Sequence, residues 1–475
     1  MPTSRRVILN RRQALQALGA GVAAGCAPDE RRAPVPKTPG HIDTIVVVMM
    51  ENRSFDHYLG SLSLVEGRTE VDGLTPEIHN LDTQGNPVYP APVSGPCVVG
   101  DPGHSWNSSR EQFAEGANSG FVTNYESRYG EGEGRWVMDY QTRADLPVHY
   151  ALADEYIVCQ RWFCSAMTST WPNRFYGHAG TSEGLTNNDL PEDGQPFAFE
   201  TVWTQLDNIG VGWRYYYTDL PFLGLMAGHM RTETTGLLED FFFDCANGLL
   251  PPVVWIDPGF AYNDDHPPHH PGVGQEFLGA IYAALADSPH WETCLLVITY
   301  DEHGGFHDHV PPGTIDDDYA DEGFDQLGFR VPALVAGPYV RSGVSDTVFD
   351  NTSWIKLVCE LHGIEPWNKR IAATQSLAEL LDVDRMARGE PRPPVELPPF
   401  TFDDSLMPLE CQYGQGVLGP TLPSDPAPMP AGHQEELYRF IRARMPEKDH
   451  TDEIARHQAL IRGVLRRAGL VRPAR

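Results

Sequence analysis

Runs of consecutive apolar residues, many of them β-branched, stand out along the chain at residues 42–50, 253–256, 295–300 and 331–336. Apolar runs without polar alternation are typical of strands that are covered on both faces. The intervals between them are long enough for helices, and apolar residues recur at three- and four-residue spacing in residues 274–286 and 353–361. The pattern predicts an α/β fold in which helices cover both faces of a central, mostly parallel sheet.

The regions outside these runs predict three additions to the sheet. Residues 60–135 are rich in Gly, Ser and Asn with weak periodicity, which favours a loop-rich insertion over one face. Residues 386–432 are proline-rich and predict an extended wrap or linker. A helical tail is expected over 433–475, with helices near 434–444 and 452–468. A basic amphipathic helix can lie on a membrane, but packing back on the acidic domain is the favoured reading.

Composition and charge narrow the classes of partner. The chain has 475 residues, of which 41% are hydrophobic and 10% aromatic, as in a globular protein with one large domain. Its formal net charge of −30 repels nucleic acids and anionic lipid surfaces, so we expect no nucleic-acid partner. A phosphate-bearing substrate would therefore be drawn in by something local, and a bound cation is the obvious candidate.

The first 26 residues predict an export signal. SRRVIL at residues 4–9 looks like a twin-arginine signal, and the apolar run at 14–24 is too short for a membrane span. VAAGC, ending at Cys26, resembles a lipoprotein cleavage box. We expect a periplasmic, membrane-anchored or secreted protein. The alternative to lipidation of Cys26 is cleavage near Ala27 and release.

The cysteines carry little chemistry of their own. Seven remain after Cys26, an odd number in a compartment where disulfides persist. Cys159 and Cys164 are close enough in sequence to form a bridge, and the spacings do not match a zinc ribbon. Buried or disulfide-bonded cysteines are therefore expected rather than metal ligands.

Carboxylates follow two of the apolar runs directly. Glu51 and Asn52 come after the first run, and Asp301 and Glu302 come after the third. Ligands gather beyond the carboxyl ends of parallel strands, so these side chains should converge there. Converging carboxylates are costly unless a cation neutralises them, and hard divalent cations prefer such oxygen ligands. A single strand-end carboxylate would suit a helix cap or a surface charge, but the pair of clusters predicts a divalent metal site.

A hydroxyl, a proline and an arginine occur in TSTWPNR at residues 168–174. A hydroxyl held beside a cation becomes a nucleophile, because the metal lowers its pKa and takes up the alkoxide charge. Thr170 is the candidate for this role. Arg174 can fork onto a tetrahedral oxyanion. A serine/threonine turn that caps a helix would explain the run equally well.

Histidines supply the remaining candidate chemistry. His266, shortly after the second run, could bind metal, donate a proton to a leaving group or steady a phosphoryl oxygen. His269 and His270 fit a loop surface better. For His104, in GHSW, the pattern gives no reason beyond a buried aromatic loop.

Four motifs together carry a family resemblance: ENRSFDHY at residues 51–58, TWPNR at 170–174, DHP at 265–267 and YDEHGG at 300–305. In combination they resemble the bacterial phospholipase C and acid phosphatase family of phosphoesterases. Further matches extend the resemblance over about residues 40–385, the expected catalytic domain. The resemblance implies an alkaline-phosphatase-like fold and metal-dependent hydrolysis of phosphate esters.

The resemblance also implies roles for individual residues. Carried over by position, the ligands of the metal are Glu51, Asn52, Asp301, Glu302 and the nucleophile Thr170. The residues around the phosphoryl group are His104, His266 and His309. We expect the Thr170 alkoxide to form a phosphothreonine, a histidine (His309 or His266) to protonate the departing alcohol, and Asn52 and Arg174 to stabilise the equatorial oxygens.

The predicted function is that of a phospholipase C-type diesterase, acting on phospholipids such as phosphatidylcholine. A broad acid phosphatase acting on small phosphate esters is the alternative enzyme, and a non-catalytic lipoprotein that binds phosphorylated ligands is the alternative from another class. Thr170 separates the chain from sulfatases, which resemble it at this turn but need Cys or Ser there. The oxygen ligands suit calcium or magnesium, and the family leaves zinc open.

Overall fold

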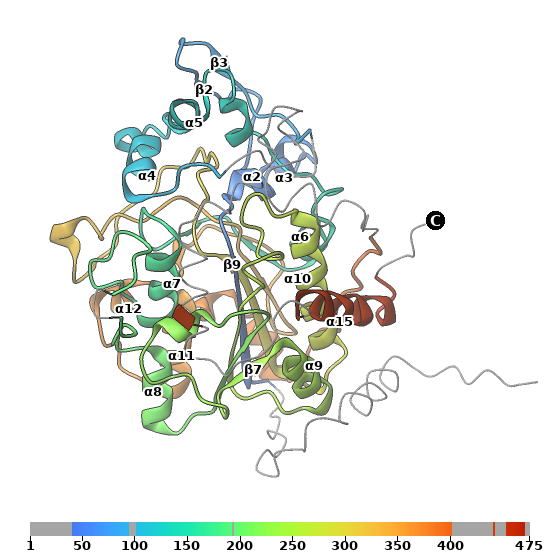
Figure 1. Ribbon diagram of the computed structural model, residues 1–475. Coiled ribbons are helices and arrows are strands. Elements are labelled where there is room, and N and C mark those ends of the chain that lie inside the picture. The colour runs from blue at the N-terminus through green and yellow to red at the C-terminus, as the bar shows by residue number, and fades with distance from the viewer. Residues whose placement is uncertain (1–39, 95–100, 192–193, 401–439, 442–452, 471–475) are drawn as a thin grey trace, which may run out of the picture.

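The computed structural model describes residues 40–94, 101–191, 194–400, 440–441 and 453–470. Within them, eight strands form one sheet in the order β11-β4-β10-β9-β1-β8-β6-β7 (Figure 1). In that order, the strand bounds are Gly343–Ser345, Ile157–Cys159, Leu334–Ala336, Cys294–Tyr300, Thr44–Met50, Val253–Ile256, Trp213–Tyr217 and Thr235–Leu237. β1 pairs in parallel with both β8 and β9, and every residue of β1 is buried. The predicted mostly parallel sheet is confirmed.

The fourth apolar run gives a shorter strand than the sequence suggests. β10 begins only at Leu334 and is antiparallel to both β9 and β4. Pro332 lacks the N–H that a ladder requires, which explains why the strand starts after it. The short two-stranded sheets pair β12 with β5 and β2 with β3, whose bounds are Phe349–Asp350, Trp162–Phe163, Asn80–Leu81 and Pro87–Val88.

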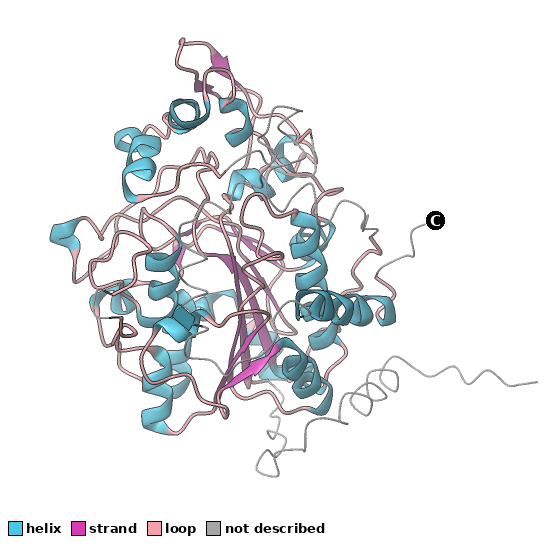
Figure 2. Ribbon diagram, in the orientation of Figure 1, coloured by secondary structure: helices cyan, strands magenta, loops and turns pink. Residues whose placement is uncertain are grey.

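Helices cover both faces of the sheet, as predicted (Figure 2). The helices on one side are α6, α9 and α10, at Pro147–Glu155, Leu238–Asn247 and Pro271–Ala286. Those on the other side are α7, α8, α11 and α12, at Thr170–Ala179, Val202–Ile209, Ser353–His362 and Lys369–Ala373. Both helices expected from periodicity are present, as α10 and α11. The short α13 spans Val383–Arg388, and the 3-10 helices are Ala114–Gly116, Gly134–Val137, Phe222–Leu225, Pro289–Thr293, Ala320–Glu322 and Leu377–Leu380.

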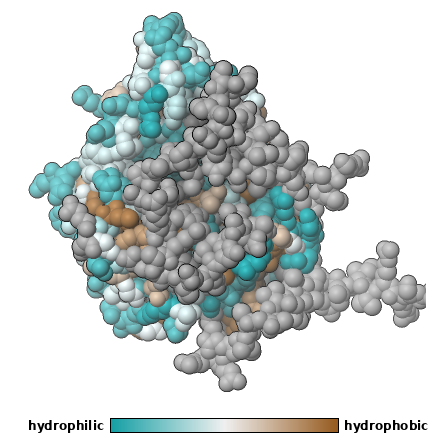
Figure 3. Space-filling view, viewed as in Figure 1, coloured by the Kyte–Doolittle hydropathy of each residue, from teal (hydrophilic) through white to brown (hydrophobic). Residues whose placement is uncertain are grey.

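The loop-rich insertion lies beyond the carboxyl ends of β1 and β9 rather than over a face of the sheet (Figure 1). Its helices are α3, α4 and α5, at Ser61–Leu64, Trp106–Phe113 and Phe121–Tyr129, and α2, at Phe55–Leu59, leads into it from β1. The visible surface of this lobe is largely hydrophilic (Figure 3). Because helices already occupy both faces of the sheet, its end is the place left for the insertion. The lobe thereby covers the strand ends from which a site would be built.

The C-terminal helix packs back on the domain, as favoured from the sequence. α15, at Glu453–Arg467, lies against α10, and Arg462 Nε is 3.1 Å from Glu276 Oε2. Arg456 Nε is 3.1 Å from Glu239 Oε1. The predicted helix near 434–444 lies outside the described residues except for Phe440 and Ile441, as do the export signal and most of the proline-rich segment. The domain boundaries therefore stay predictions.

The cysteines within the described residues are all buried: Cys159, Cys164, Cys245, Cys294 and Cys359. The bridge considered between Cys159 and Cys164 is not formed. Cys159 ends β4, whereas the Cys164 thiol donates to the Ala166 carbonyl at 3.5 Å. Of the described helices, none is both long and apolar enough to cross a membrane.

Candidate active site

Two parallel strands deliver the predicted carboxylates to one place. β1 and β9 pair in register as far as Met50 opposite Tyr300, so the residues that follow them emerge side by side. The backbone N–H of Asn52 donates to Asp301 Oδ1 at 3.0 Å, and that of Arg53 donates to the Glu302 carbonyl at 3.1 Å. The strand-end convergence expected from the sequence is present.

A tight turn shapes the two loops that leave these strands. Asn52 has φ 60°, in the left-handed region that Asn tolerates better than most residues. Opposite it, Gly304 has φ 63°, and a Cβ there would lie 2.2 Å from the Asn52 carbonyl oxygen. Only glycine therefore allows the two backbones to approach this closely, which fixes the position of the Asn52 side chain.

Thr170 lies at the first position of α7, on the neighbouring side of the site. Its hydroxyl donates to Asn52 Oδ1 at 3.4 Å, and 7% of the residue is exposed. The side-chain carbonyl of Asn173 accepts from the Ala166 N–H at 2.9 Å and holds the turn that precedes the helix. The start of a helix favours negative charge. The hydroxyl is thus held where an attacking oxygen and an anionic group would both be stabilised.

Burial makes negative charge unfavourable on the three acidic residues of the site, Glu51, Asp301 and Glu302. Burial, and then repulsion by Glu51, raises the pKa of Asp301 to about 7. Burial also raises the pKa of Glu302 to about 8 and that of Glu51 well above its usual value. Asp301 Oδ2 and Glu302 Oε1 are buried and accept no hydrogen bond. Buried carboxylate oxygens without donors fit a hard divalent cation, so the residues present suit the implied metal.

Arg174 does not take the position predicted for it. Its guanidinium is fully buried and donates to Glu51 Oε1 at 3.2 Å and to Asp257 Oδ1 at 3.3 Å. It also donates to the carbonyls of Met49 and Met50. A guanidinium held in this way fixes the positions of these carboxylates and has no free face for a phosphoryl oxygen. We therefore replace the predicted contact with the phosphoryl oxygens by a positioning role.

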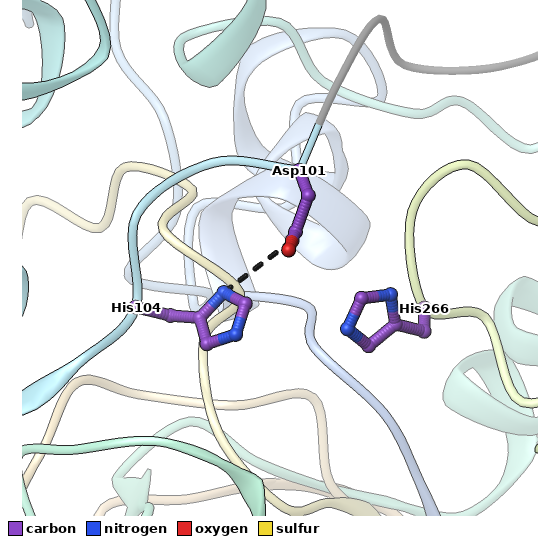
Figure 4. Close-up of side chains that lie close together, drawn as sticks. All are labelled: Asp101, His104 and His266. Carbon is purple, nitrogen blue, oxygen red and sulfur yellow. Dashed lines mark ion pairs between the residues drawn. The ribbon is translucent and has the colours of Figure 1, made fainter. Parts of the chain in front are cut away.

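His104 and His266 face each other across the site, as Figure 4 shows. Their ring centroids are 5.8 Å apart and the rings are nearly perpendicular. Both histidines interact electrostatically with Glu302 and act to lower its pKa, against the larger effect of burial. These two predicted phosphoryl-binding residues are therefore brought together with the carboxylates. His269, expected on a loop surface, is instead buried and lies 2.5 Å from Asp264 Oδ1.

His309 is held in a different set of contacts. Its Nδ1 lies 2.8 Å from Asp56 Oδ2 and its Nε2 lies 3.1 Å from Asp72 Oδ1. Burial lowers the pKa of His309, but the Asp56 carboxylate outweighs this and raises it to about 9. With both ring nitrogens engaged by carboxylates, His309 is a poor match for the predicted proton donor. The choice between His309 and His266 as the proton donor stays a prediction, and these contacts favour His266.

Two acidic residues near the site were missed by sequence reasoning. Asp257 directly follows β8 and accepts hydrogen bonds from Arg174 and Trp255. The strand-end rule that selected Asp301 would have found it. Asp101 lies 3.5 Å from His104 through its Oδ1 and the histidine Nδ1. Its position three residues before His104 is the only signal in the sequence.

Known proteins resemble this chain over the segment that contains the residues of the candidate site. The model of the Phosphoesterase family matches residues 42–365. Non-specific phospholipase C1 of Arabidopsis thaliana is 38% identical over 340 residues, which cover 65% of this chain and 62% of the plant protein. Phospholipase C B of Mycobacterium tuberculosis is 34% identical over 396 residues, covering 69% of this chain and 75% of that protein. The chain thus spans less than two thirds of the plant relative.

Among solved structures, a protein in the alkaline phosphatase superfamily from Vibrio parahaemolyticus aligns with 77% of this chain and 78% of its own. The TM-score is 0.35 and the sequence identity 11%.

Proposed function

Since this chain belongs to the Phosphoesterase family, we propose that it hydrolyses phosphate esters, and phosphodiesters of the phospholipase C type, such as phosphatidylcholine, in particular. One observation carries the proposal: the Thr170 hydroxyl donates a hydrogen bond to Asn52 Oδ1, beside the buried carboxylates Asp301 and Glu302. The relatives named as phospholipases C support the choice of substrate class.

The residues proposed to hold a divalent cation are Glu51, Asn52, Asp301, Glu302 and Thr170. A cation bound there lowers the pKa of a coordinated hydroxyl and neutralises charge on the phosphoryl oxygens. Three carboxylates and an amide suit calcium or magnesium, and zinc also binds carboxylates. Within the described residues, Arg174 is the nearest fixed positive charge, and it is already shared by Glu51, Asp257 and Asp301.

The chain's own side chains then carry a two-step reaction. In the first step the deprotonated Oγ1 of Thr170 attacks phosphorus, the bond to the alcohol breaks, and the alcohol leaves with a proton from His266. In the second step a water attacks the phosphothreonine from the side that the alcohol vacated and gives one proton to the same histidine, and the bond between phosphorus and Thr170 Oγ1 breaks, which restores the nucleophile. Asn52 and His104 stabilise the equatorial oxygens.

Substitution of the nucleophile tests this proposal. Thr170→Ala should lower the initial rate by at least about 10³-fold, since it removes the attacking oxygen. Thr170→Ser keeps a hydroxyl and is the matched control, which should retain far more activity. The rates are measured on p-nitrophenyl phosphorylcholine and p-nitrophenyl phosphate, with chelated enzyme and one metal restored at a time. Appreciable activity in Thr170→Ala would overturn the covalent mechanism.

The same assay separates the alternatives. Preference for the choline diester supports the phospholipase C type, and preference for the monoester makes the protein a broad acid phosphatase. If neither substrate is hydrolysed with calcium, magnesium, zinc or manganese, the result would favour a non-catalytic protein that binds phosphorylated ligands.

We also propose that the protein is exported, through the twin-arginine-like residues 4–9, and anchored by lipid on Cys26 or released. Cell fractionation checks this when Arg5 and Arg6 are both changed to Lys. Export of that variant at the normal level would contradict the proposal.

A further inference from the structure

The start of α7, where Thr170 lies, is capped by a residue from outside the helix. Ser169 occupies the position at which a serine side chain commonly caps a helix, but its side chain makes no such hydrogen bond. The cap is instead Asn188, whose Oδ1 accepts from the Trp171 backbone N–H at 2.8 Å and from the Ser169 hydroxyl at 3.1 Å. Asn188 thus contacts the residues on both sides of the candidate nucleophile.

These contacts also fix the direction of the Asn188 amide. A backbone N–H only donates, so the atom that faces Trp171 must be the side-chain oxygen, and the nitrogen takes the other position. The oxygen and nitrogen of an amide are about 2.3 Å apart, so Nδ2 lies within about 5 Å of the Trp171 nitrogen. Asn188 is only 3% exposed, and among the described residues none accepts from Nδ2. A buried amide is therefore left with unused N–H groups at the start of α7.

The loop that carries Asn188 is fastened to the turn before the helix. Thr168 Oγ1 donates to the Thr186 carbonyl at 2.6 Å. On either side of Asn188 the chain is exposed, and there Asn187 Nδ2 donates to Asp189 Oδ2 at 2.5 Å. The loop therefore holds Asn188 inward at a fixed place, although its two polar neighbours face solvent.

The first turn of α7 supplies a further donor at the same place. Within the described residues, the backbone N–H of Thr170 has no acceptor, and Pro172 has no N–H to offer. The beginning of a helix favours negative charge. An anionic oxygen beside Thr170 Oγ1 would thus meet two donors without partners, the Thr170 N–H and the Asn188 amide.

We propose that Asn188 binds a non-bridging phosphoryl oxygen of the substrate through Nδ2, in addition to capping α7 through Oδ1. The inference deepens the proposed function and rests on it in one respect: the phosphoryl group must lie at Thr170 Oγ1, where the attack takes place. A fixed N–H donor lowers the barrier to the extent that its hydrogen bond strengthens in the transition state. Asn188 then acts together with Asn52 and His104.

Substitution separates the two atoms of the amide. Asn188→Asp keeps an oxygen to cap the helix and replaces the donor by a second oxygen, and Asp caps as well as Asn does. Its melting temperature should stay close to that of the wild type, whereas kcat/KM on p-nitrophenyl phosphorylcholine should fall about 10²-fold. Asn188→Leu removes both atoms, so it should lose a similar share of the activity and also melt at a lower temperature.

Asn187→Asp is the matched control. It adds the same negative charge one residue away, on the exposed side of the loop, and should keep the wild-type rate. General repulsion of an anionic substrate is thereby separated from loss of the donor. Inorganic phosphate is the second probe, titrated calorimetrically into chelated protein with one metal restored at a time. Its dissociation constant should rise at least about 10-fold in Asn188→Asp and stay unchanged in Asn187→Asp.

A role in capping alone gives a different result. Asn188→Asp would then keep the wild-type kcat/KM and phosphate affinity, and only Asn188→Leu would lose activity, together with stability. That result would overturn the inference and leave the proposed function standing. If Asn188→Asp does not fold, Asn188→Leu decides, because full activity and unchanged phosphate affinity in that variant contradict a donor at this position.

The phosphate titration keeps the inference separate from the proposed function. A wild type that binds phosphate but hydrolyses neither p-nitrophenyl substrate would remove the proposed function, and the affinities of the Asn188 variants would still decide whether the amide binds a phosphoryl oxygen. A wild type that neither binds phosphate nor hydrolyses an ester would overturn both.

Discussion

Two clusters of buried charged side chains lie at the carboxyl end of the sheet, and they differ in how their charges are balanced. The strand-end carboxylates are Glu51, Asp301 and Glu302. The Arg330 cluster consists of Asp56, Asp308, His309 and Arg330. Nearly all of these side chains are buried, with His309 the most accessible of them at 21% of its side chain. The clusters therefore differ in pairing rather than in burial.

The pKa values of Asp56 and Glu302 report the difference most clearly, while burial raises the pKa of Asp308 in the Arg330 cluster to about 6. Burial alone would raise the pKa of Asp56, but His309 and then Arg330 outweigh burial and hold it well below the usual value. Burial raises the pKa of Glu302 to about 8. The Arg330 cluster sets two cationic side chains against two carboxylates. At the strand ends one guanidinium, Arg174, is divided among several, so negative charge remains uncompensated.

The comparison separates structural from functional acidic residues in this molecule. A carboxylate whose charge is matched by the chain's own cations contributes to stability and has no need of a ligand. A buried carboxylate without a cationic partner destabilises the fold. Such a residue is a candidate for a functional site, where a bound cation neutralises its charge. This reasoning assigns a structural role to the Arg330 cluster, and it supports the proposal that the strand-end carboxylates belong to the reaction centre.

Among the changes that compare the two clusters, Glu302→Gln should produce the largest effect. The change removes a proposed cation ligand, and since bound metal supplies several kcal/mol of transition-state stabilisation, we expect the rate to fall by about 10³-fold. The metal-free variant should be at least as stable as the wild type, because burial disfavours the charged form of Glu302 and the amide carries no charge. Metal analysis, initial rates and urea unfolding of chelated protein check these points. A large loss of stability in the metal-free variant would refute the assignment.

Asp56→Asn is the matched change in the other cluster and should behave in the opposite way. It leaves Arg330 and His309 with too few carboxylates, and breaking a buried ion pair costs about 3–5 kcal/mol. The midpoint of urea unfolding should drop accordingly, while the amount of bound metal per folded molecule stays unchanged. Equal stability of Asp56→Asn and wild type would remove the distinction between the clusters.

The fold could be predicted further than the site. The strands β1, β8 and β9 and the helices α10 and α11 follow from apolar runs and from periodicity, because both report burial directly. The antiparallel β10 could not be foreseen, since an apolar run carries no strand direction. The place of the insertion was also missed, because weak periodicity indicates loops but does not indicate where they pack.

For the site, residue type and strand-end position sufficed for Glu51, Asp301 and Glu302. They did not suffice for Arg174 and His309, which depend on what their partners are in three dimensions. An arginine four residues after a candidate nucleophile fits an oxyanion contact, but Asp257 and Glu51 take up its guanidinium instead. A sequence shows which side chains are able to pair, and the fold decides which of them do.

The smallest expected effect is the pH dependence that His309 confers. The groups that face it are Asp56, Asp72, Asp308, Arg330 and His307. Its folded pKa of about 9 lies above the ordinary value of 6.5, so its stabilising contribution is complete below pH 6.5 and is lost as the pH rises through 9. His309→Gln should abolish that loss, which we expect to be on the order of 1 kcal/mol after solvent screening.

Urea midpoints at pH 6, 7.5 and 9 measure the contribution of His309, with the exposed His79→Gln as the control that should follow the wild type. The stability difference between wild type and His309→Gln should shrink from the lowest pH to the highest, because Asp56 keeps its charge throughout this range and the imidazole loses its proton as the pH rises. A difference that is constant across the three values would mean that His309 is neutral in the folded protein. In that case Arg330 alone balances Asp56, and His309 regains its place among the candidate proton donors.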